Sequence, residues 1–317
     1  MTGNDLIDLM HQSYRRVHII GTPENGIIAA LDLEGRLFTV INGRVLNRVV
    51  PFAILNRSNK NVYLNPGGDA LWPAPEGSCF GYEYGTGKWR VPPAITSAVW
   101  EVVEESENET VIRAEIDLVN NRQRGIPCEF ERHIEIEQRE NSLIQNVTEM
   151  IRYIGAKTLD NSEFRLAPWS LCQFDTGTGC KVIMPPPSAE DIRDIYDSSV
   201  LQRGMSGDKY VVETKTDFRF QLGLGKNVPW IEYNSGNDFR VKRYAGALPP
   251  GQSYIDIADA PPEQFPTDYG AKLSIYCDPS DFMEIEACGG CTDTLVSGTE
   301  LSVNIITEYV INESVEP

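Results

Sequence analysis

Alternation of apolar and polar residues with a period of two runs through most of this chain. It is clearest at 110–116 (Thr-Val-Ile-Arg-Ala-Glu-Ile), at 130–137 (Phe-Glu-Arg-His-Ile-Glu-Ile-Glu) and at 301–306 (Leu-Ser-Val-Asn-Ile-Ile). Similar segments recur from 27 to 310, separated by clusters of Gly, Pro, Asn and Asp. Because successive side chains of a strand point to opposite faces, the pattern predicts strands with one buried and one wet face. Antiparallel sheets have this arrangement.

Helical patterns are few. We expect one short helix within 4–16, and the cap-like sequence Ser-Ala-Glu-Asp at 188–191 predicts a second helix that runs to about Leu201. No change in composition, low-complexity linker or repeat of 20–50 residues divides the 317 residues. We therefore predict an all-β fold, with large stacked antiparallel sheets in a single domain over 1–317 and an N-terminal extension at 1–20.

The chain is strongly acidic, with 28 Lys and Arg against 46 Asp and Glu and a formal net charge of -18. Such a surface repels phosphate groups, which excludes a nucleic-acid partner and disfavours an anionic membrane. No run approaches 18 apolar residues, and no basic segment followed by an apolar run opens the chain, so neither a membrane span nor a secretory signal is visible.

Seven cysteines form an odd and scattered set. This usage is typical of reduced, mostly buried thiols and favours a cytoplasmic location. A periplasmic or secreted location is the alternative, if a signal peptide has been removed. The CxxC sequence Cys288-Gly289-Gly290-Cys291 lacks both the βαβ context of a redox motif and the second ligand pair of a zinc site, so we interpret it as a glycine turn.

The segment 65–93 is the first candidate for a binding site. It is rich in Gly and Pro and carries aromatic and acidic residues, among them Asp69, Trp72, Glu83 and Trp89. Long loops inside compact domains tend to be functional. Flat aromatic faces stack on the apolar face of a pyranose, while carboxylates bind its hydroxyls. The alternative is that these aromatic residues only close one end of a sandwich.

Three stretches, in this order, resemble the galactose mutarotase-like (aldose 1-epimerase-like) superfamily. The first, 65–77, is similar to the Gly-Gly and Trp-Pro segment that lines the sugar cleft in that family. The second, at 130–143 and 166–171, resembles the central hairpin and the Ala-Pro-Trp strand that follows it. The third, at 281–287 and 298–301, looks like the late strand that carries the family's carboxylate and the turn into the last strand.

The resemblance implies a large antiparallel supersandwich, with few short helices, that binds a small sugar or a glycan. We predict no cofactor and identify no metal-ligating residues, while the sequence leaves metal binding open. In mutarotases a Glu removes the proton of the anomeric hydroxyl while a His protonates the ring oxygen. Glu284 and Glu286 are the candidates for the Glu. Two positions apart on one strand, they share a face, so one of them can have a raised pKa. The alternative is a solvated strand face.

The histidine of that mechanism has no evident counterpart. His11 and His18 precede the matching region, and His133 lies beside Arg132 on the hairpin strand, outside any motif of this kind. The acid is therefore either replaced, by a tyrosine or a carboxylate, or missing.

Two further residues complete the expected sugar site. Arg165 stands four positions before Trp169, which on a strand is the same face, and a guanidinium beside an indole suits a sugar acid. We expect Arg165 in the cleft and Trp169 in the core. Trp230 is the other expected edge of the cleft.

Three functions remain open at this point. The first is interconversion of the anomers or epimers of a sugar, with Glu284 or Glu286 as the base. The second is a non-catalytic sugar-recognition or accessory module with the same cleft. The third is a relative of polysaccharide lyases or glycoside hydrolases, in which hydrolysis needs two carboxylates about 5–10 Å apart.

Overall fold

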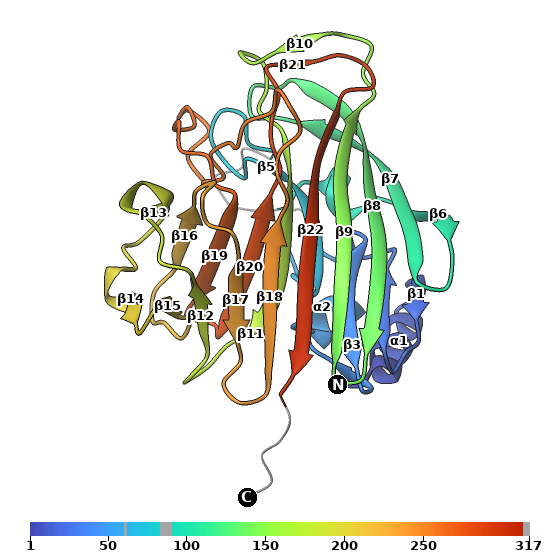
Figure 1. Ribbon diagram of the computed structural model, residues 1–317. Helices are drawn as coiled ribbons and strands as arrows, with labels where there is room; N and C mark the ends of the chain where they lie inside the picture. Colours follow the sequence, from blue (N-terminus) through green and yellow to red (C-terminus); the bar gives the residue numbers. More distant parts are fainter. Residues whose placement is uncertain (60–61, 83–90, 313–317) are drawn as a thin grey trace, which may run out of the picture.

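Two large antiparallel sheets, stacked face to face, form the protein (Figure 1). This computed structural model describes residues 1–59, 62–82 and 91–312. The first sheet has the strand order β1 (Val17–Gly21), β2 (Gly26–Ala30), β3 (Arg36–Ile41), β5 (Asp69–Ala74), β11 (Ala167–Asp175), β20 (Phe282–Cys288), β19 (Leu273–Asp278), β16 (Phe220–Leu224) and β13 (Ile192–Asp194), with β4 (Arg44–Val45) paired to β3.

The second sheet has the order β14 (Arg203–Ser206), β15 (Lys209–Glu213), β12 (Lys181–Met184), β17 (Ile231–Asn234), β18 (Phe239–Ala245), β22 (Glu300–Ile311), β9 (Ser142–Tyr153), β8 (Gly125–Arg139), β7 (Glu109–Val119) and β6 (Glu101–Glu105). A small pair, β10 (Leu159–Asp160) with β21 (Thr294–Leu295), lies at the top of Figure 1. The predicted all-β, antiparallel architecture is confirmed.

Apolar side chains from the facing sides of the two sheets form the main core. On β7, β8 and β9 the buried residues alternate with exposed or half-buried ones, as the sequence pattern predicts. Phe174 of β11 stacks on Tyr233 of β17, with ring centroids 5.0 Å apart, and so joins the first sheet to the second. Because this core occupies the face of the first sheet that points to the second sheet, a binding site on the first sheet has to lie on the opposite face.

A cluster of charged side chains crosses the same core. Nη1 of Arg243 on β18 donates to Oδ2 of Asp69 at 2.9 Å, and Ser170 of β11 donates to Oδ1 of Asp69 at 2.8 Å. Arg132 of β8 donates from Nη2 to Oε1 of Glu149 on β9 at 2.6 Å. Two cations and two anions are thus buried together, which pairs every charge and connects the sheets.

The N-terminal helix α1 (Gly3–Gln12) lies within the segment predicted to be helical and begins with a capping box between Thr2 and Asp5. It packs beside α2 (Pro51–Leu55) on the far side of β2 and β3, where Leu6 and Met10 are buried against Phe38. The face of the first sheet that points away from the second sheet is therefore covered at this end.

The second predicted helix, from 188 to 201, is wrong. Two 3-10 turns, η1 (Ala189–Asp191) and η2 (Val200–Gln202), stand at either end of a segment that contains strand β13. The physical reason lies in the expected cap. Oγ of Ser188 donates to the Asp191 carboxylate at 2.8 Å, and that carboxylate also accepts from Asn227 at 3.0 Å. The chain then pairs with β16 at the sheet edge instead of coiling.

The segment 65–93 is not the continuous loop that the sequence suggested. Its residues 69–74 form β5, which pairs with β11 and, through Asp69, with β3. The short helix α3 (Pro93–Thr96) follows at its end. The aromatic residue Trp72 is therefore held on a rigid central strand.

Candidate active site

The first sheet has two faces of different character. On β20, Met283 and Ile285 belong to the core between the sheets, so alternation turns Glu284 and Glu286 to the opposite face. Glu284 and Glu286 therefore lie on the same face of β20. Opposite them on β11, Leu171 is paired with Glu286 and Gln173 with Glu284.

A cavity of about 260 Å³ lies on this face, and both glutamates line it. Trp72 from β5, Trp169 from β11 and Tyr276 from β19 supply aromatic walls. The two indoles meet edge to face with ring centroids 6.4 Å apart. Concave, largely apolar sites with a few convergent polar groups are typical of small-molecule binding.

Glu286 is held on the floor of the cavity by neighbouring side chains. Its Oε2 accepts from Nε1 of Trp169 at 3.0 Å and from Nε2 of Gln221 at 2.9 Å. Its partner Glu284 accepts from Nε2 of Gln173 at 2.7 Å. Glu284 is 7% exposed and Glu286 is fully buried. These contacts fix both carboxyl groups without neutralising them by an arginine or lysine.

Burial raises the pKa of Glu286 to about 7, although hydrogen bonds from Ser274, Trp169, Gln221 and Glu284 oppose this effect. Burial also raises the pKa of Glu284 well above its ordinary value, and the negative charge of Glu286 raises it further. Two adjacent buried carboxyls cannot both ionise easily at neutral pH. The pair is thus able to hold one proton and one negative charge near pH 7.

None of the three histidines lines this cavity. His11 is exposed on α1, Nε2 of His18 lies 3.0 Å from the Thr110 hydroxyl, and His133 contacts Glu131 on the outer face of the second sheet. The acid of a histidine–glutamate mechanism is therefore absent here, and a second carboxyl stands beside the first.

The structure brings Trp72, Glu284 and Glu286 together, whereas Asp69, Arg165 and Trp230 do not line the cavity. Asp69 faces the core and is bound to Arg243, because it is an odd number of positions from Trp72 on the same strand. Glu83 and Trp89 fall outside the described residues.

Arg165 and Trp230 also lie away from the cavity. Arg165 precedes β11, so the strand-face argument does not apply to it; its guanidinium stacks over Phe80 at 5.3 Å. Trp230 stacks with Lys242 at 4.0 Å, on the side of the second sheet that points away from the first. Trp169, expected in the core, is instead a wall of the cavity.

Sequence reasoning did not identify Gln221, Arg219 and Tyr276 as lining residues. Gln221 alternates with apolar neighbours on β16, which indicates a face different from theirs. The strand order that places β16 and β19 next to β20 depends on pairings between distant segments, which no local pattern carries.

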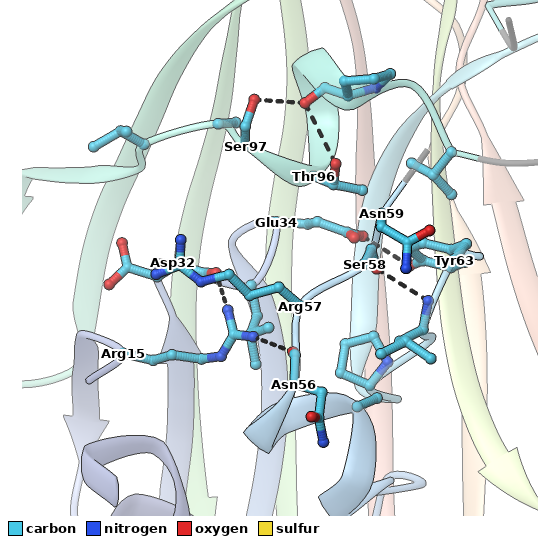
Figure 2. A pocket seen from close by; sticks show the side chains of 18 of the residues that line it. Arg15, Asp32, Glu34, Asn56, Arg57, Ser58, Asn59, Tyr63, Thr96 and Ser97 are labelled. Atoms are coloured by element: carbon cyan, nitrogen blue, oxygen red, sulfur yellow. Dashed lines mark hydrogen bonds between the residues drawn. The ribbon is translucent and has the colours of Figure 1, made fainter. Parts of the chain in front are cut away.

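A larger hollow of about 660 Å³ lies beside α2 and α3 (Figure 2). Several of its polar groups already bond to the protein. Arg15 donates to the carbonyl oxygens of Asp32 at 2.9 Å and Asn56 at 2.7 Å, and Ser97 donates to the carbonyl oxygen of Pro93 at 2.5 Å. Glu34 accepts from Arg36 at 2.8 Å. We therefore base the candidate site on the smaller cavity, whose carboxyls have raised pKa values.

All seven cysteines are free thiols, and all but Cys180 are buried. The glycine turn expected between Cys288 and Cys291 is not formed: no turn is present at 289–290, the Gly289 amide donates to the Pro168 carbonyl oxygen at 2.8 Å, and Cys291 pairs with Ser253. Among the described residues, no three His, Cys, Asp or Glu side chains gather as a metal centre. No helix in the described ranges is long and apolar enough to cross a bilayer.

Residues 27–225 match a family described as a family of unknown function, DUF6786. The chain belongs to this family. The matched segment of the DUF6786 family contains β5, β11 and β16, and hence Trp72, Trp169 and Gln221, whereas Glu284 and Glu286 follow it. No curated protein matches the chain in sequence.

Solved structures show the fold of this DUF6786 member. A galactose mutarotase-like protein from Lactobacillus casei superposes with a TM-score of 0.56 at 12% identity, covering 93% of this chain and 100% of the other. A galactose mutarotase related enzyme from Lactobacillus acidophilus gives 0.53 at 12% identity, with 95% and 100% covered. A candidate aldose 1-epimerase from Escherichia coli K12 gives 0.54 at 10% identity, with 94% and 99% covered. The fold is therefore a divergent galactose mutarotase-like supersandwich, as the sequence resemblance predicted.

Proposed function

We propose that this protein binds a monosaccharide in the cavity on the first sheet and interconverts its anomers, with Glu286 as base and Glu284 as acid. One observation carries the proposal: two adjacent carboxyls with raised pKa values stand in a cavity walled by two tryptophans. The similarity in fold to galactose mutarotase-like proteins supports the choice of a sugar as substrate. Aromatic faces suit the apolar side of a pyranose.

The hydrogen bonds support the choice of Glu286 as the base. Glu286 accepts from the indole of Trp169 and from the amide of Gln221, and donors directed at a carboxylate favour its charged form. Burial and the neighbouring charge favour the neutral form of Glu284. Before reaction, Glu286 is the ionised member of the pair and Glu284 carries the proton.

The reaction then balances without a histidine. Glu286 takes the proton of the anomeric hydroxyl while Glu284 gives its proton to the ring oxygen, so the C1–O5 bond breaks and an open-chain aldehyde forms. Rotation about C1–C2 presents the other face of the carbonyl. In the reverse step Glu284 recovers the proton from O5 as O5 attacks C1, and Glu286 returns its proton to O1. Both carboxyls end in their starting states.

The test is the exchange rate between anomers, measured by NMR magnetisation transfer for common hexoses, pentoses and uronates. We expect Glu286→Gln and Glu284→Gln each to lower the catalysed rate by about 10²–10⁴-fold, the range for loss of one acid–base group. Glu137→Gln is the matched control, because Glu137 is exposed on β8. The proposal is contradicted if the wild-type protein accelerates anomer exchange of none of these sugars.

A non-catalytic sugar-recognition module is the second candidate. The observation in its favour is that Glu286 has no exposed surface and its Oε2 accepts two hydrogen bonds, as a structural carboxylate does. Saturation-transfer NMR of the same sugars separates the two functions. Binding without any anomer exchange supports recognition alone.

A further inference from the structure

We infer that the sugar carries a carboxylate and that Arg219 binds it, which makes the protein selective for uronic acids over neutral sugars. The inference rests on the proposed use of the cavity as a sugar site. Arg219 lies directly before β16 and lines the same cavity as Glu284 and Glu286, yet the reaction described above does not use it.

Aromatic rings hold the plane of the Arg219 guanidinium. Its central carbon lies 3.9 Å from the ring centroid of Tyr196 and 5.4 Å from that of Tyr276. The hydroxyl of Tyr196 in turn accepts from the amide of Asp259 at 3.1 Å. Stacking uses the faces of a guanidinium and leaves its N–H edge available.

The N–H groups of Arg219 are largely unused within the described part of the chain. Its Nε is buried and has no hydrogen-bond partner there. Its ion pair is loose, with Nη1 3.6 Å from Oδ2 of Asp259. By contrast, the guanidinium of Arg132 makes close hydrogen bonds to Glu149 and to the carbonyl oxygen of Gly35.

A planar group with free, fixed donors is matched to a planar acceptor. Arginine binds a carboxylate through two parallel N–H···O bonds, which supply direction as well as energy. A neutral sugar has no counterpart for this cation. The cavity of about 260 Å³ has room for a small ligand, so one monosaccharide can contact both Arg219 and the glutamate pair.

The charge of the remaining lining is compatible with an acidic ligand. Glu76, Glu284 and Glu286 line the cavity. Burial raises the pKa of both Glu284 and Glu286, and the charge of Glu286 raises that of Glu284 further, so the pair does not present two full negative charges near pH 7. Arg219 balances part of the remaining charge. A ligand carboxylate beside the Arg219 guanidinium, whose side chain is 41% exposed, forms a charge-assisted pair at the mouth of the cavity.

The test compares dissociation constants, from calorimetry or NMR titration, of D-glucuronate, D-galacturonate, the corresponding neutral hexoses and glucose 6-phosphate. We expect wild-type protein to prefer the uronates by about tenfold or more, the effect of one charge-assisted hydrogen bond. Arg219→Gln should remove this preference. Its dissociation constants for the neutral hexoses should stay within about twofold of the wild-type values, a change in free energy that is less than half of the effect of one such hydrogen bond. Arg219→Lys should keep part of it, because lysine retains the charge without the planar donors.

Arg193→Gln is the matched control. Arg193 also stacks on a tyrosine, Tyr269 at 5.3 Å, but it lies on β13 outside the cavity lining. It should leave the preference unchanged, and thermal melting of all variants checks that they fold. Equal binding of uronates and neutral hexoses, a preference that survives Arg219→Gln, or tighter binding of the sugar phosphate than of the uronates overturns the inference.

The outcomes for the two proposals are separable. Uronate preference that depends on Arg219, without any anomer exchange, supports the inference and contradicts the epimerase proposal. Anomer exchange that depends on Glu286, with no effect of Arg219→Gln on selectivity, does the reverse.

Discussion

Trp169 on β11 donates its indole N–H to Oε2 of Glu286 on β20 across 3.0 Å. The same ring meets Trp72 edge to face. One side chain thus forms a wall of the cavity and stabilises the charged form of the carboxylate on its floor. This coupling connects the binding of an apolar sugar face to the protonation state of the proposed base.

The first prediction concerns this hydrogen bond. Trp169→Phe keeps an aromatic ring but removes a donor to Glu286, so the pKa of Glu286 should rise above about 7. We expect the acidic limb of the pH–rate profile for anomer exchange to move up by about one unit, since one hydrogen bond to a charged group is worth roughly one pKa unit or more.

Trp100→Phe is the matched control for that change. Trp100 is buried, and its indole N–H has no hydrogen-bond partner among the described residues. Loss of this indole N–H in Trp100→Phe should leave the pH–rate profile of anomer exchange unchanged. An unchanged profile in Trp169→Phe would show that the indole does not stabilise the charged Glu286.

The second prediction concerns stability and pH. The folded-state pKa of Glu286, about 7, lies above its ordinary 4.5, so the unfolded chain releases this proton first. The stability that Glu286 contributes is complete below about pH 4.5 and is lost as pH rises through about 7. The loss is on the order of 3 kcal/mol, because each pH unit between the two pKa values is worth about 1.4 kcal/mol.

Glu286→Gln removes this titration. Urea denaturation from pH 4.5 to 8 should therefore show the variant gaining stability relative to wild type as pH rises. Glu284→Gln should show a change of the same sign, since burial and Glu286 raise the pKa of Glu284 too. A difference that stays constant over this pH range contradicts the raised pKa values.

The sequence pattern predicted the sheets and the glutamate pair for the same reason. Positions two apart on a strand share a face, and this rule needs no knowledge of neighbouring strands. The rule alone therefore places Glu284 and Glu286 together. The same rule separates Asp69 from Trp72, but it applies only once 65–93 is known to contain a strand rather than a continuous loop.

Other members of the site depend on strand order. Gln221 reaches Glu286 across β19, a contact between residues 65 positions apart. Trp169 and Ser170 point to opposite faces of β11, and both faces of this strand are buried. Burial alone therefore does not distinguish a tryptophan in the core from one in a cavity wall. The expected place of Arg165 is wrong because this residue precedes the first residue of β11.

The third prediction concerns the charges between the sheets. Burial alone would raise the pKa of Asp69, but Arg243 and Arg132 outweigh it and lower the pKa. Asp69→Asn leaves buried arginines without a full partner and should cost about 3–5 kcal/mol of unfolding free energy.

Asp238→Asn is the comparison for that change. Asp238 pairs with Arg44, and both side chains are 46% exposed, so the loss should be about 0–1 kcal/mol. Urea denaturation of both variants measures the difference. Similar losses for Asp69→Asn and Asp238→Asn would contradict a stabilising role for the buried cluster.

The fourth prediction concerns the glycine that turns the chain into β5. Gly67 has a φ of +93°, and a Cβ there would lie 1.9 Å from the carbonyl oxygen of Arg48. Its amide donates to Oδ1 of Asn65, which lines the cavity, and its carbonyl oxygen accepts from Arg36 at 2.7 Å. Gly67→Ala must therefore move backbone that holds the cavity wall.

Gly236→Ala separates this clash from the cost of the backbone angle. Gly236 has a φ of +68° in the turn between β17 and β18, and a Cβ at this position would meet no described atom within 4 Å. Gly236→Ala should lower the free energy of unfolding by about 1–2 kcal/mol, which is the conformational penalty of a left-handed backbone alone. Gly67→Ala should cost clearly more in urea denaturation and should also weaken sugar binding, because Asn65 moves with the turn. Equal losses would mean that the Arg48 carbonyl yields without strain and that the turn does not support the cavity.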